Sequence, residues 1–516
     1  MLLPPKFALQ LLDIDPNSGD AQSSSTQTDH THENTLCSPD QRSVEGAASN
    51  MKFAPPKVPE ETETCPQLKE EHKGEPVPID TTFPPSTLLP IPGAYAIQLQ
   101  QNKRLTPKDH WQDVRELTFH MSENIKYQPG DVMTIYPKNF PVDVQRLIDI
   151  MGWNDVADKP LIFKPESPDF YHAENLITLV PADLHCMKNS TLRQLLTHNL
   201  DITAIPKRHF FEVIAQHTSD PMHKERLLEF TDPKWRDELF DYTTRPRRSI
   251  LEVLADFPSV KLPWQWTCTI FPLIRGRQFS ISSGGEKRTS SEKGFVQVQL
   301  LVAIVKYRTV LRKIRQGLCS RYIASLPAGT TINVTLSSND SFVKKYKSKE
   351  EEDRRLGIPI IMVAPGTGLA PCRSLVWERA ALAAEGLGRQ VGDIYLFYGG
   401  RNKAADYFYK HEWEFSSLRT HVFTAFSRDQ KEKIYVQDII RKEAKLVGKL
   451  MVDRKAMVYV CGSSGNMPKA VRAALVDVVA QWLEENIDSV TTASREKVEA
   501  RIEVMEKDGT YVQETW

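Results

Sequence analysis

The stretch Ala364-Pro365-Gly366-Thr367-Gly368-Leu369-Ala370-Pro371 follows an apolar run and precedes a segment with helical spacing. Glycines in a strand-to-helix turn let the backbone approach a dinucleotide closely. The spacing is not G-x-G-x-x-G, so it disfavours an ordinary Rossmann dehydrogenase. A plain strand-to-helix turn is the alternative interpretation, and it is the weaker one.

Four apolar, β-branched runs surround this turn, and most are followed by helical segments. This order is typical of an open parallel α/β sheet. We therefore expect an α/β domain over residues 355–516. The four runs are residues 359–364, 393–398, 421–425 and 457–461.

Earlier in the chain, strand-like runs enclose a set of helical segments. A β-barrel interrupted by a helical insert would produce this order, so we expect a barrel domain over residues 91–350 with an insert at about 140–245. The strand-like runs are 95–99, 114–120, 131–136, 277–282, 295–305 and 331–336. The helical segments are 141–151, 191–200, 224–230 and 250–256.

The first 90 residues differ from the rest in composition. Residues 13–90 are rich in Ser, Thr, Asn, Glu and Pro and contain few aromatic residues. Such a segment cannot bury enough apolar surface to offset its ordering entropy. We therefore expect residues 1–90 to be a linker or disordered segment.

Composition excludes several classes of protein. Lys+Arg and Asp+Glu both total 66, so the net charge of zero argues against nucleic acid or a membrane surface as partner. The seven cysteines form no CxxC pair and no metal-ligand spacing, so we expect no metal site and a reducing compartment. No signal peptide or membrane-spanning run is visible. These observations predict a soluble cytoplasmic enzyme.

Ser427 and Arg428 follow the third apolar run, and the segment 433–437 (Lys-Ile-Tyr-Val-Gln) comes shortly after. At the carboxyl edge of a parallel sheet, Ser, Arg and Lys would surround a 2′-phosphate, with Tyr435 stacked on adenine. Since NAD sites usually place an acid at this strand end, the Ser-Arg pair favours NADPH, although Asp429 weakens the inference. A solvated charge cluster is the alternative, and it is the better one for an isolated Ser-Arg pair.

Two further motifs suit a flavin. On a barrel strand, Arg277-Gln278-Phe279-Ser280 combines a guanidinium for a phosphate, a ring that can pack on the isoalloxazine, and a hydroxyl that can reach its N5. The segment 315–320 (Arg-Gln-Gly-Leu-Cys-Ser) reads as a helix start whose N–H groups can approach a pyrophosphate. Either motif alone also occurs by chance or as a simple helix cap.

The order and separation of these motifs, together with the segment 459–462 (Tyr-Val-Cys-Gly) and the final Glu514-Thr515-Trp516, carry a resemblance. Over about residues 91–516 the chain resembles the cytochrome P450 reductase family, and within it the NADPH-dependent diflavin oxidoreductases. The segment 3–7 (Leu-Pro-Pro-Lys-Phe) is similar to the family's junction after its flavodoxin domain.

The resemblance implies a fold and a set of site residues. The fold is a ferredoxin-reductase-type FAD barrel with a helical insert, followed by an α/β NADP-binding domain. The residues implied for FAD are Arg247 (or, with a one-residue slip, Arg248), Arg277, Gln278, Phe279, Ser280, Gly317, Leu318, Cys319, Ser320 and Trp516, which would cover the ring. Those implied for NADPH are Thr367, Ser427, Arg428, Lys433, Ile434, Tyr435, Val436 and Gln437. The catalytic trio around flavin N5 and nicotinamide C4 is Ser280, Cys461 and Glu514.

The chain departs from the family's pattern at several positions. Phe279 stands where the family often has Tyr, Glu514 replaces the usual Asp, and Ala470 sits where relatives carry an Asp beside the nucleotide. No flavodoxin domain is recognisable in the first 90 residues, so we expect FAD but no FMN on this chain.

The resemblance also implies the reaction, which is hydride transfer from NADPH to FAD followed by single electrons to an acceptor protein. In the resembled group this acceptor is the iron–sulfur assembly protein anamorsin, reached through FMN, so a flavodoxin domain acting in trans is a second expected partner. A different acceptor, a P450 or a sulfite reductase hemoprotein, is one alternative. A reductase-fold binding module without catalysis is the other.

Overall fold

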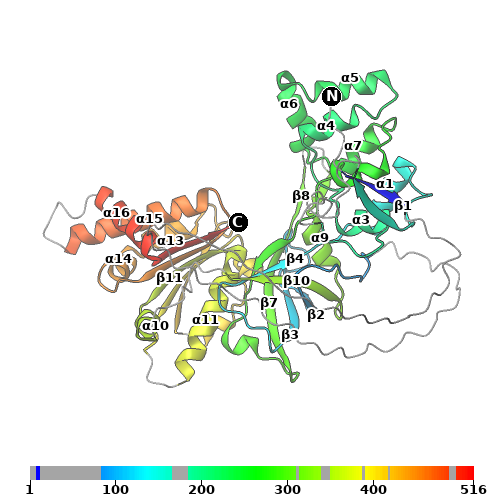
Figure 1. Cartoon of the computed structure of the whole chain (residues 1–516). Helices are drawn as coiled ribbons and strands as arrows, with labels where there is room; N and C mark the ends of the chain where they lie inside the picture. The colour runs from blue at the N-terminus through cyan, green and yellow to red at the C-terminus, as the bar shows by residue number, and fades with distance from the viewer. Residues whose placement is uncertain are drawn as a thin grey trace, which may run out of the picture. The chain divides into compact units, whose positions relative to one another are not determined.

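The computed structural model describes residues 7–11, 83–165, 184–309, 313–338, 349–385, 390–415, 419–486 and 495–516. Within these ranges a six-stranded antiparallel sheet with a helical insert precedes a five-stranded parallel sheet (Figure 1). This architecture confirms the predicted fold class, a reductase-type β-barrel with a helical insert followed by an α/β domain.

The antiparallel strands lie in the spatial order β6-β4-β10-β2-β3-β7. A bridge between Ile281 and Leu300 joins the two edges, so the sheet is a nearly closed barrel. Leu99, Phe119 and Val298 are among the wholly buried side chains of its core. The strands are β2 (Tyr95–Arg104), β3 (Asp113–Ser122), β4 (Val132–Ile135), β6 (Arg277–Ser280), β7 (Phe295–Ile304) and β10 (Thr331–Ser337).

Helices interrupt the barrel between β4 and β6. They continue to Ile270, beyond the expected end of the insert at about 245, because a capping box of Ser249 and Glu252 starts another helix. Their apolar faces share one buried core. The helices are α1 (Pro141–Met151), α3 (Leu192–His198), α4 (Arg208–Ile214), α5 (Pro221–Glu229), α6 (Arg236–Leu239), α7 (Ile250–Asp256) and α8 (Thr267–Ile270).

A short strand near the start of the chain belongs to this insert. β1 (Phe7–Leu11) pairs antiparallel with β5 (Leu161–Pro165), and Leu9 is wholly buried in the core of the insert. The sequence predicts a linker over residues 1–90, and for residues 7–11 this is wrong because Leu9 has a buried apolar site to fill. Most of the remaining linker range lies outside the described residues.

The parallel strands lie in the order β13-β12-β11-β14-β15, so the chain adds β12 and β13 on one side of β11 (Ile360–Pro365) and then β14 and β15 on the other. Such a switch point opens a crevice at the carboxyl ends of the strands. One face of the sheet packs on α11 and the other on α13, α14, α15 and α16 (Figure 1). The other elements are β12 (Ile394–Gly400), β13 (Thr420–Phe426), β14 (Met457–Gly462), β15 (Tyr511–Thr515), α10 (Lys349–Leu356), α11 (Leu369–Ala384), α12 (Lys403–Asp406), α13 (Val436–Lys442), α14 (Ala444–Val452), α15 (Asn466–Asn486) and α16 (Arg495–Asp508).

Helix α11 also packs against the barrel segment that follows β6. The Arg373 guanidinium, 1% exposed, donates to the carbonyl of Ser282 (3.0 Å), and the Ser374 hydroxyl donates to the carbonyl of Ser283 (2.7 Å). A Cβ on Gly284 would lie 2.0 Å from the Ser374 carbonyl oxygen, so only glycine permits this approach. The end of β6 is therefore fixed against the parallel-sheet domain.

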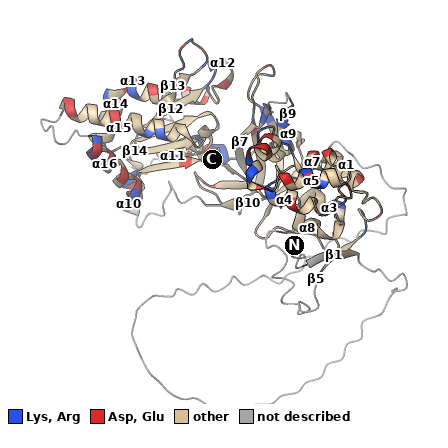
Figure 2. Ribbon diagram, turned by 90° about the horizontal axis from the view of Figure 1, so that it is seen from above, with Lys and Arg blue, Asp and Glu red and all other residues tan. Residues whose placement is uncertain are grey.

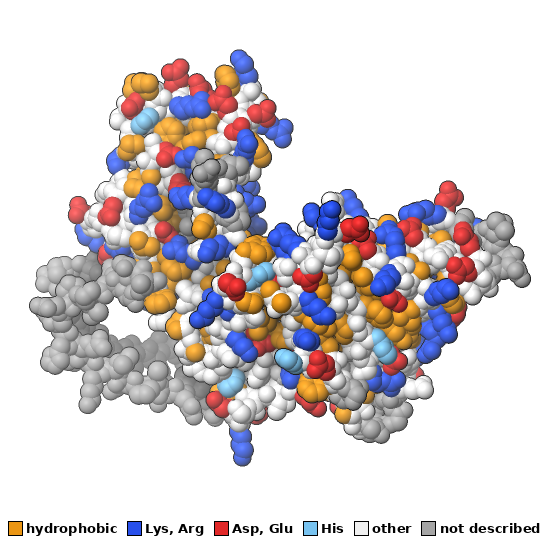
Figure 3. Space-filling model, turned by 180° about the vertical axis from the view of Figure 1, so that it is seen from behind, with side chains coloured by type: hydrophobic (Ala, Val, Ile, Leu, Met, Phe, Trp, Pro, Cys, Tyr) orange, Lys and Arg blue, Asp and Glu red, His pale blue; other side chains and the backbone are white. Residues whose placement is uncertain are grey.

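The surface carries both charges in mixture. The face shown in Figure 3 intersperses Lys and Arg with Asp and Glu, which accords with the net charge of zero. Basic side chains gather more densely around β9 (Ile314–Gln316) and α9 (Leu318–Ser325), as Figure 2 shows. Among the helices of the described ranges, none has both the length and the apolar character needed to cross a bilayer.

Candidate functional site

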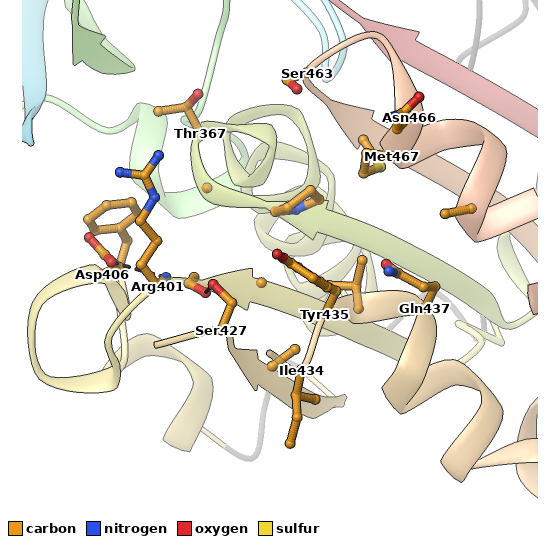
Figure 4. A pocket seen from close by; sticks show the side chains of 18 of the residues that line it. Thr367, Arg401, Asp406, Ser427, Ile434, Tyr435, Gln437, Ser463, Asn466 and Met467 are labelled. Atoms are coloured by element: carbon orange, nitrogen blue, oxygen red, sulfur yellow. Dashed lines mark hydrogen bonds between the residues drawn. The ribbon is translucent and has the colours of Figure 1, made fainter. Parts of the chain in front are cut away.

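A cavity of about 660 Å³ lies at the carboxyl ends of the parallel strands, where the switch point predicts a ligand (Figure 4). Its walls come mainly from the turns after β11, β12, β13 and β14, and two barrel residues, Gln112 and Val114, also contribute. Its position and mixed polar and apolar lining suit a nucleotide coenzyme.

The glycine turn after β11 forms the floor of this cavity. Gly366 has φ +61°, a conformation that glycine adopts without strain. A Cβ on Gly368 would lie 2.2 Å from the carbonyl oxygen of Cys461, so the turn packs directly against the end of β14. Thr367, between these two glycines, lines the cavity.

Six of the eight residues predicted for NADPH line the cavity: Thr367, Ser427, Ile434, Tyr435, Val436 and Gln437. Ser427 is nearly buried, and its backbone N–H donates to the carbonyl of Gly400 (3.0 Å). Arg428 and Lys433 are exposed and are not part of the cavity lining. The ring of Tyr435 extends toward Ser427 in Figure 4 and is 45% exposed, so its face is open to a base.

Arg401 and Asp406 also line the cavity and were not singled out from the sequence. The N–H of Arg428 donates to the carbonyl of Arg401 (2.8 Å), so the two cations sit on adjacent strand ends. Burial, with the like charge of Arg428, lowers the pKa of Arg401. The sequence contains the information needed to predict Arg401. It follows Gly399-Gly400 at the end of the second apolar run, just as Arg428 comes after the third.

Two members of the predicted catalytic trio lie side by side. Cys461 on β14 is opposite Glu514 on β15 in the parallel register, and both side chains are buried. Burial, with contributions from Cys372 and Glu514, holds the pKa of the Cys461 thiol well above its usual value. At neutral pH Cys461 is therefore a protonated thiol rather than a nucleophilic thiolate.

Trp516 follows β15 and lines the same cavity. Its N–H donates to the carbonyl of Gly462 (3.1 Å), and its carbonyl accepts from Ser464 (2.9 Å). These bonds fix the backbone, whereas the side chain is 53% exposed. Ala470 also lines this cavity, so the missing Asp of the family pattern falls within the site.

Two of the residues predicted for FAD, Arg277 and Cys319, lie near each other in the barrel domain. Burial raises the pKa of the Cys319 thiol to about 12, and the positive charge of Arg277, which lies nearby, partly opposes this increase. Cys319 is in the first turn of α9, and Gly317 is its N-cap. The N–H groups of a first helical turn have no intrahelical acceptor, so Arg277 and this helix start together suit a pyrophosphate.

The turn 245–248 is joined to the same region, because the Arg315 guanidinium donates to the carbonyl of Pro246 (3.1 Å). Arg248 is engaged by Tyr242, whose ring lies 4.3 Å from the guanidinium carbon, and by Asp256. Arg247 is exposed and has φ +51°.

The remaining flavin residues lie on β6. Gln278 is exposed, Phe279 packs partly against the barrel core, and Ser280 is half-buried opposite Val132 of β4. Ser280 thus lies on the antiparallel sheet, two residues before the segment held by α11, whereas Cys461 and Glu514 lie on the parallel sheet. No cluster of metal-ligating side chains occurs in the described part of the chain.

Comparison with known proteins places these features in a class. Residues 92–322 match the family model of the FAD binding domain, and residues 362–473 match that of the oxidoreductase NAD-binding domain. The barrel region therefore contains an FAD binding domain, and the parallel sheet an NAD-binding domain of the kind found in oxidoreductases.

Relatives identify the family within this class. The chain is 47% identical to proteins named NADPH-dependent diflavin oxidoreductase 1 from Aspergillus fumigatus and Emericella nidulans, over 83% of this chain and 64% of each relative. It is 35% identical to the protein of that name from Saccharomyces cerevisiae, over 92% of this chain and 72% of the relative. The chain belongs to the NADPH-dependent diflavin oxidoreductase 1 family. It spans about 64% of the length of the first two relatives.

Proposed function

We propose that this chain is an NADPH-dependent flavoprotein reductase that transfers hydride from NADPH to FAD and then electrons to an acceptor protein. The observation that carries the proposal is the pairing of Cys461 with Glu514 next to two elements of the cavity wall, the glycine turn that Cys461 contacts and Trp516 at the end of β15. FAD supplies the redox chemistry, because it takes two electrons as a hydride and releases them singly.

The protein's contribution in this scheme is positioning. Thr367, Ser427 and Tyr435 would hold the adenosine half of NADPH in the cavity, leaving its nicotinamide end toward Trp516. Arg277 and the first turn of α9 would hold the FAD pyrophosphate. Because hydride transfer requires two atoms in near-attack contact, fixing both cofactors accounts for much of the expected rate.

Cys461, Glu514 and Ser280 would surround the reacting atoms. The Cys461 thiol keeps its proton, since burial raises its pKa, and so offers a neutral contact that does not repel a hydride. The Glu514 carboxylate can stabilise the positive charge that the nicotinamide gains as it loses hydride. The Ser280 hydroxyl can donate a hydrogen bond to a flavin nitrogen.

For the acceptor we propose an iron–sulfur assembly protein of the anamorsin type in the cytoplasm, reached with the help of a flavodoxin domain. The support is membership of the family alone. A P450 or a sulfite reductase hemoprotein is the alternative acceptor, and direct reduction assays with each purified protein distinguish them.

The proposal is tested on the purified chain reconstituted with FAD. We expect flavin absorbance, and ferricyanide reduction that is faster with NADPH than with NADH. Glu514→Gln should lower kcat at least tenfold and leave the KM for NADPH nearly unchanged, whereas substitution of the exposed Glu496 should do neither. Protein that binds FAD but does not oxidise NADPH would instead support the binding-module alternative.

A further inference from the structure

The barrel contributes an aromatic side chain to the wall of the coenzyme site. Trp111 lies in the connection between β2 and β3, and the guanidinium carbon of Arg401 is 3.9 Å from the centroid of its ring. Arg401 itself lines the cavity. The indole is 50% exposed, so it supports the arginine without enclosing it. A side chain from a connection of the barrel domain thus orients a cation of the parallel-sheet domain.

A second contact from the same connection holds the backbone of Arg401. The Asp406 carboxylate accepts hydrogen bonds from the N–H groups of Arg401 (3.1 Å) and Asn402 (3.0 Å). His110 Nε2 lies 3.0 Å from the other carboxylate oxygen, close enough for an ion pair although not aligned for a hydrogen bond. Trp111 and His110 therefore act on the two ends of the same arginine.

The connection that carries both residues is itself braced. The Arg104 guanidinium donates to the carbonyl of His110 (2.8 Å), and the buried Thr106 hydroxyl accepts from Arg104 (3.1 Å) and from the N–H of Val114 (3.2 Å). Val114 is buried in the same apolar cluster as the strands of the parallel sheet. Trp111 is thus presented from a fixed backbone.

Arg401 is held beside another cation, and the nearby Asp406 carboxylate accepts from its backbone N–H and not from its guanidinium. Arg428 is on the adjacent strand end, and in the described ranges neither guanidinium has a carboxylate within ion-pair distance. Two arginines kept together at a cavity are stabilised when a dianion binds between them. The 2′-phosphate is the dianion that NADPH has and NADH lacks.

We propose that Trp111 is a positioning residue for coenzyme selectivity, which holds Arg401 beside Arg428 so that both guanidinium groups face the 2′-phosphate. This inference rests on the proposed function, since it takes the cavity to be the NADPH site. It assigns part of the choice between NADPH and NADH to the barrel domain. His110 supports the same arrangement through Asp406.

The test compares Trp111→Ala with Trp111→Phe in the FAD-loaded full chain. A cation–π contact at an exposed position contributes about 0.5–1 kcal/mol. Removing the ring should therefore raise both the KM for NADPH and the Kd for 2′,5′-ADP about two- to fivefold. The kcat, the KM for NADH and the Kd for 5′-ADP should stay unchanged. Trp111→Phe should restore most of the affinity because it keeps an aromatic face.

Trp235→Ala is the matched control, because Trp235 is also partly exposed and has a cation, Lys234, 5.3 Å from its ring centroid, but lies in the helical insert. It should change none of these values. If Trp111→Ala does not fold, His110→Asn provides the same test with a smaller expected rise. Equal weakening of 2′,5′-ADP and 5′-ADP, or no change in either, would overturn the inference. A wild-type chain without preference for NADPH would instead refute the proposed function itself.

Discussion

Replacing Arg428 with alanine should change coenzyme preference rather than catalysis. Arg428 follows β13 directly after Ser427, at the edge of the coenzyme cavity. If it binds the 2′-phosphate, its loss affects NADPH and leaves NADH, which has no such group. Steady-state kinetics with ferricyanide and both coenzymes measure this directly.

The magnitude follows from the exposure of Arg428. A hydrogen bond to a charged group contributes about 1.5–3 kcal/mol, and an exposed position favours the lower end of that range. About 1.5 kcal/mol corresponds to roughly a tenfold rise in the KM for NADPH. Ser427→Ala removes a neutral donor worth about 1 kcal/mol, or roughly a fivefold rise. Because both residues would contact the same phosphate, the KM for NADPH of the double variant should rise by less than the product of the two single-variant increases.

Salt and a neighbouring cation provide the controls. The difference in the KM for NADPH between wild type and Arg428→Ala should become smaller as ionic strength rises, since salt screens an exposed charge. Lys431→Ala removes another exposed cation of the same turn, three residues farther from the end of β13, and it should have little effect on the KM for NADPH. An equal loss with NADPH and NADH would refute the assignment and make Arg428 a structural arginine.

Three other outcomes follow from the structure. Deleting Trp516 should increase turnover with NADH more than turnover with NADPH, because the indole must move to admit the nicotinamide and NADH lacks the 2′-phosphate contacts that offset this cost. An unchanged NADPH/NADH preference in steady-state kinetics would show that the indole does not control access of the nicotinamide. Leu9→Ala should cost about 2–5 kcal/mol and lower Tm, whereas the exposed Gln10→Ala should not; equal Tm values would mean that β1 adds no stability. Burial alone would raise the pKa of Glu252, but Arg315, Lys313 and the N–H of Ser249 lower it to about 2. The ionised Glu252 carboxylate therefore stabilises the folded state fully above about pH 4.5, and this contribution is lost as the pH falls toward 2. In thermal unfolding, Glu252→Gln should have a lower Tm than the wild type at neutral pH, and the difference should become smaller between about pH 4.5 and 2.

Local patterns were sufficient to predict most of the two sheets. The buried strands of the parallel sheet read as continuous apolar runs because both faces are covered, and β11 matches its predicted range within one residue at each end. Helices with a marked start, such as Pro141–Met151 with proline at its first position, were predicted with their observed bounds. In these elements the local signal and the tertiary environment agree.

The short strands at both ends of the chain could not be predicted in this way. β1 and β15 each have only five residues, and both gain stability from a partner far away in the sequence. β1 pairs with residues about 150 positions later, whereas β15 pairs with β14 across two long helices. A five-residue segment carries too little periodicity to reveal such pairing.

The residues of the candidate site likewise differ in how far local sequence patterns predict them. Ser427 and Arg428 were predicted because residues at the carboxyl end of a parallel strand project toward a ligand, and that reasoning applies equally to Arg401. Trp111 is different, since it precedes a strand of the other sheet and no rule about its own neighbours relates it to a nucleotide. It reaches the site only because α11 and the segment after β6 fix the two domains together, with Arg373 buried between them. A residue whose role depends on domain packing has no local signature, so selectivity determinants of this kind have to be found in the structure and tested by substitution.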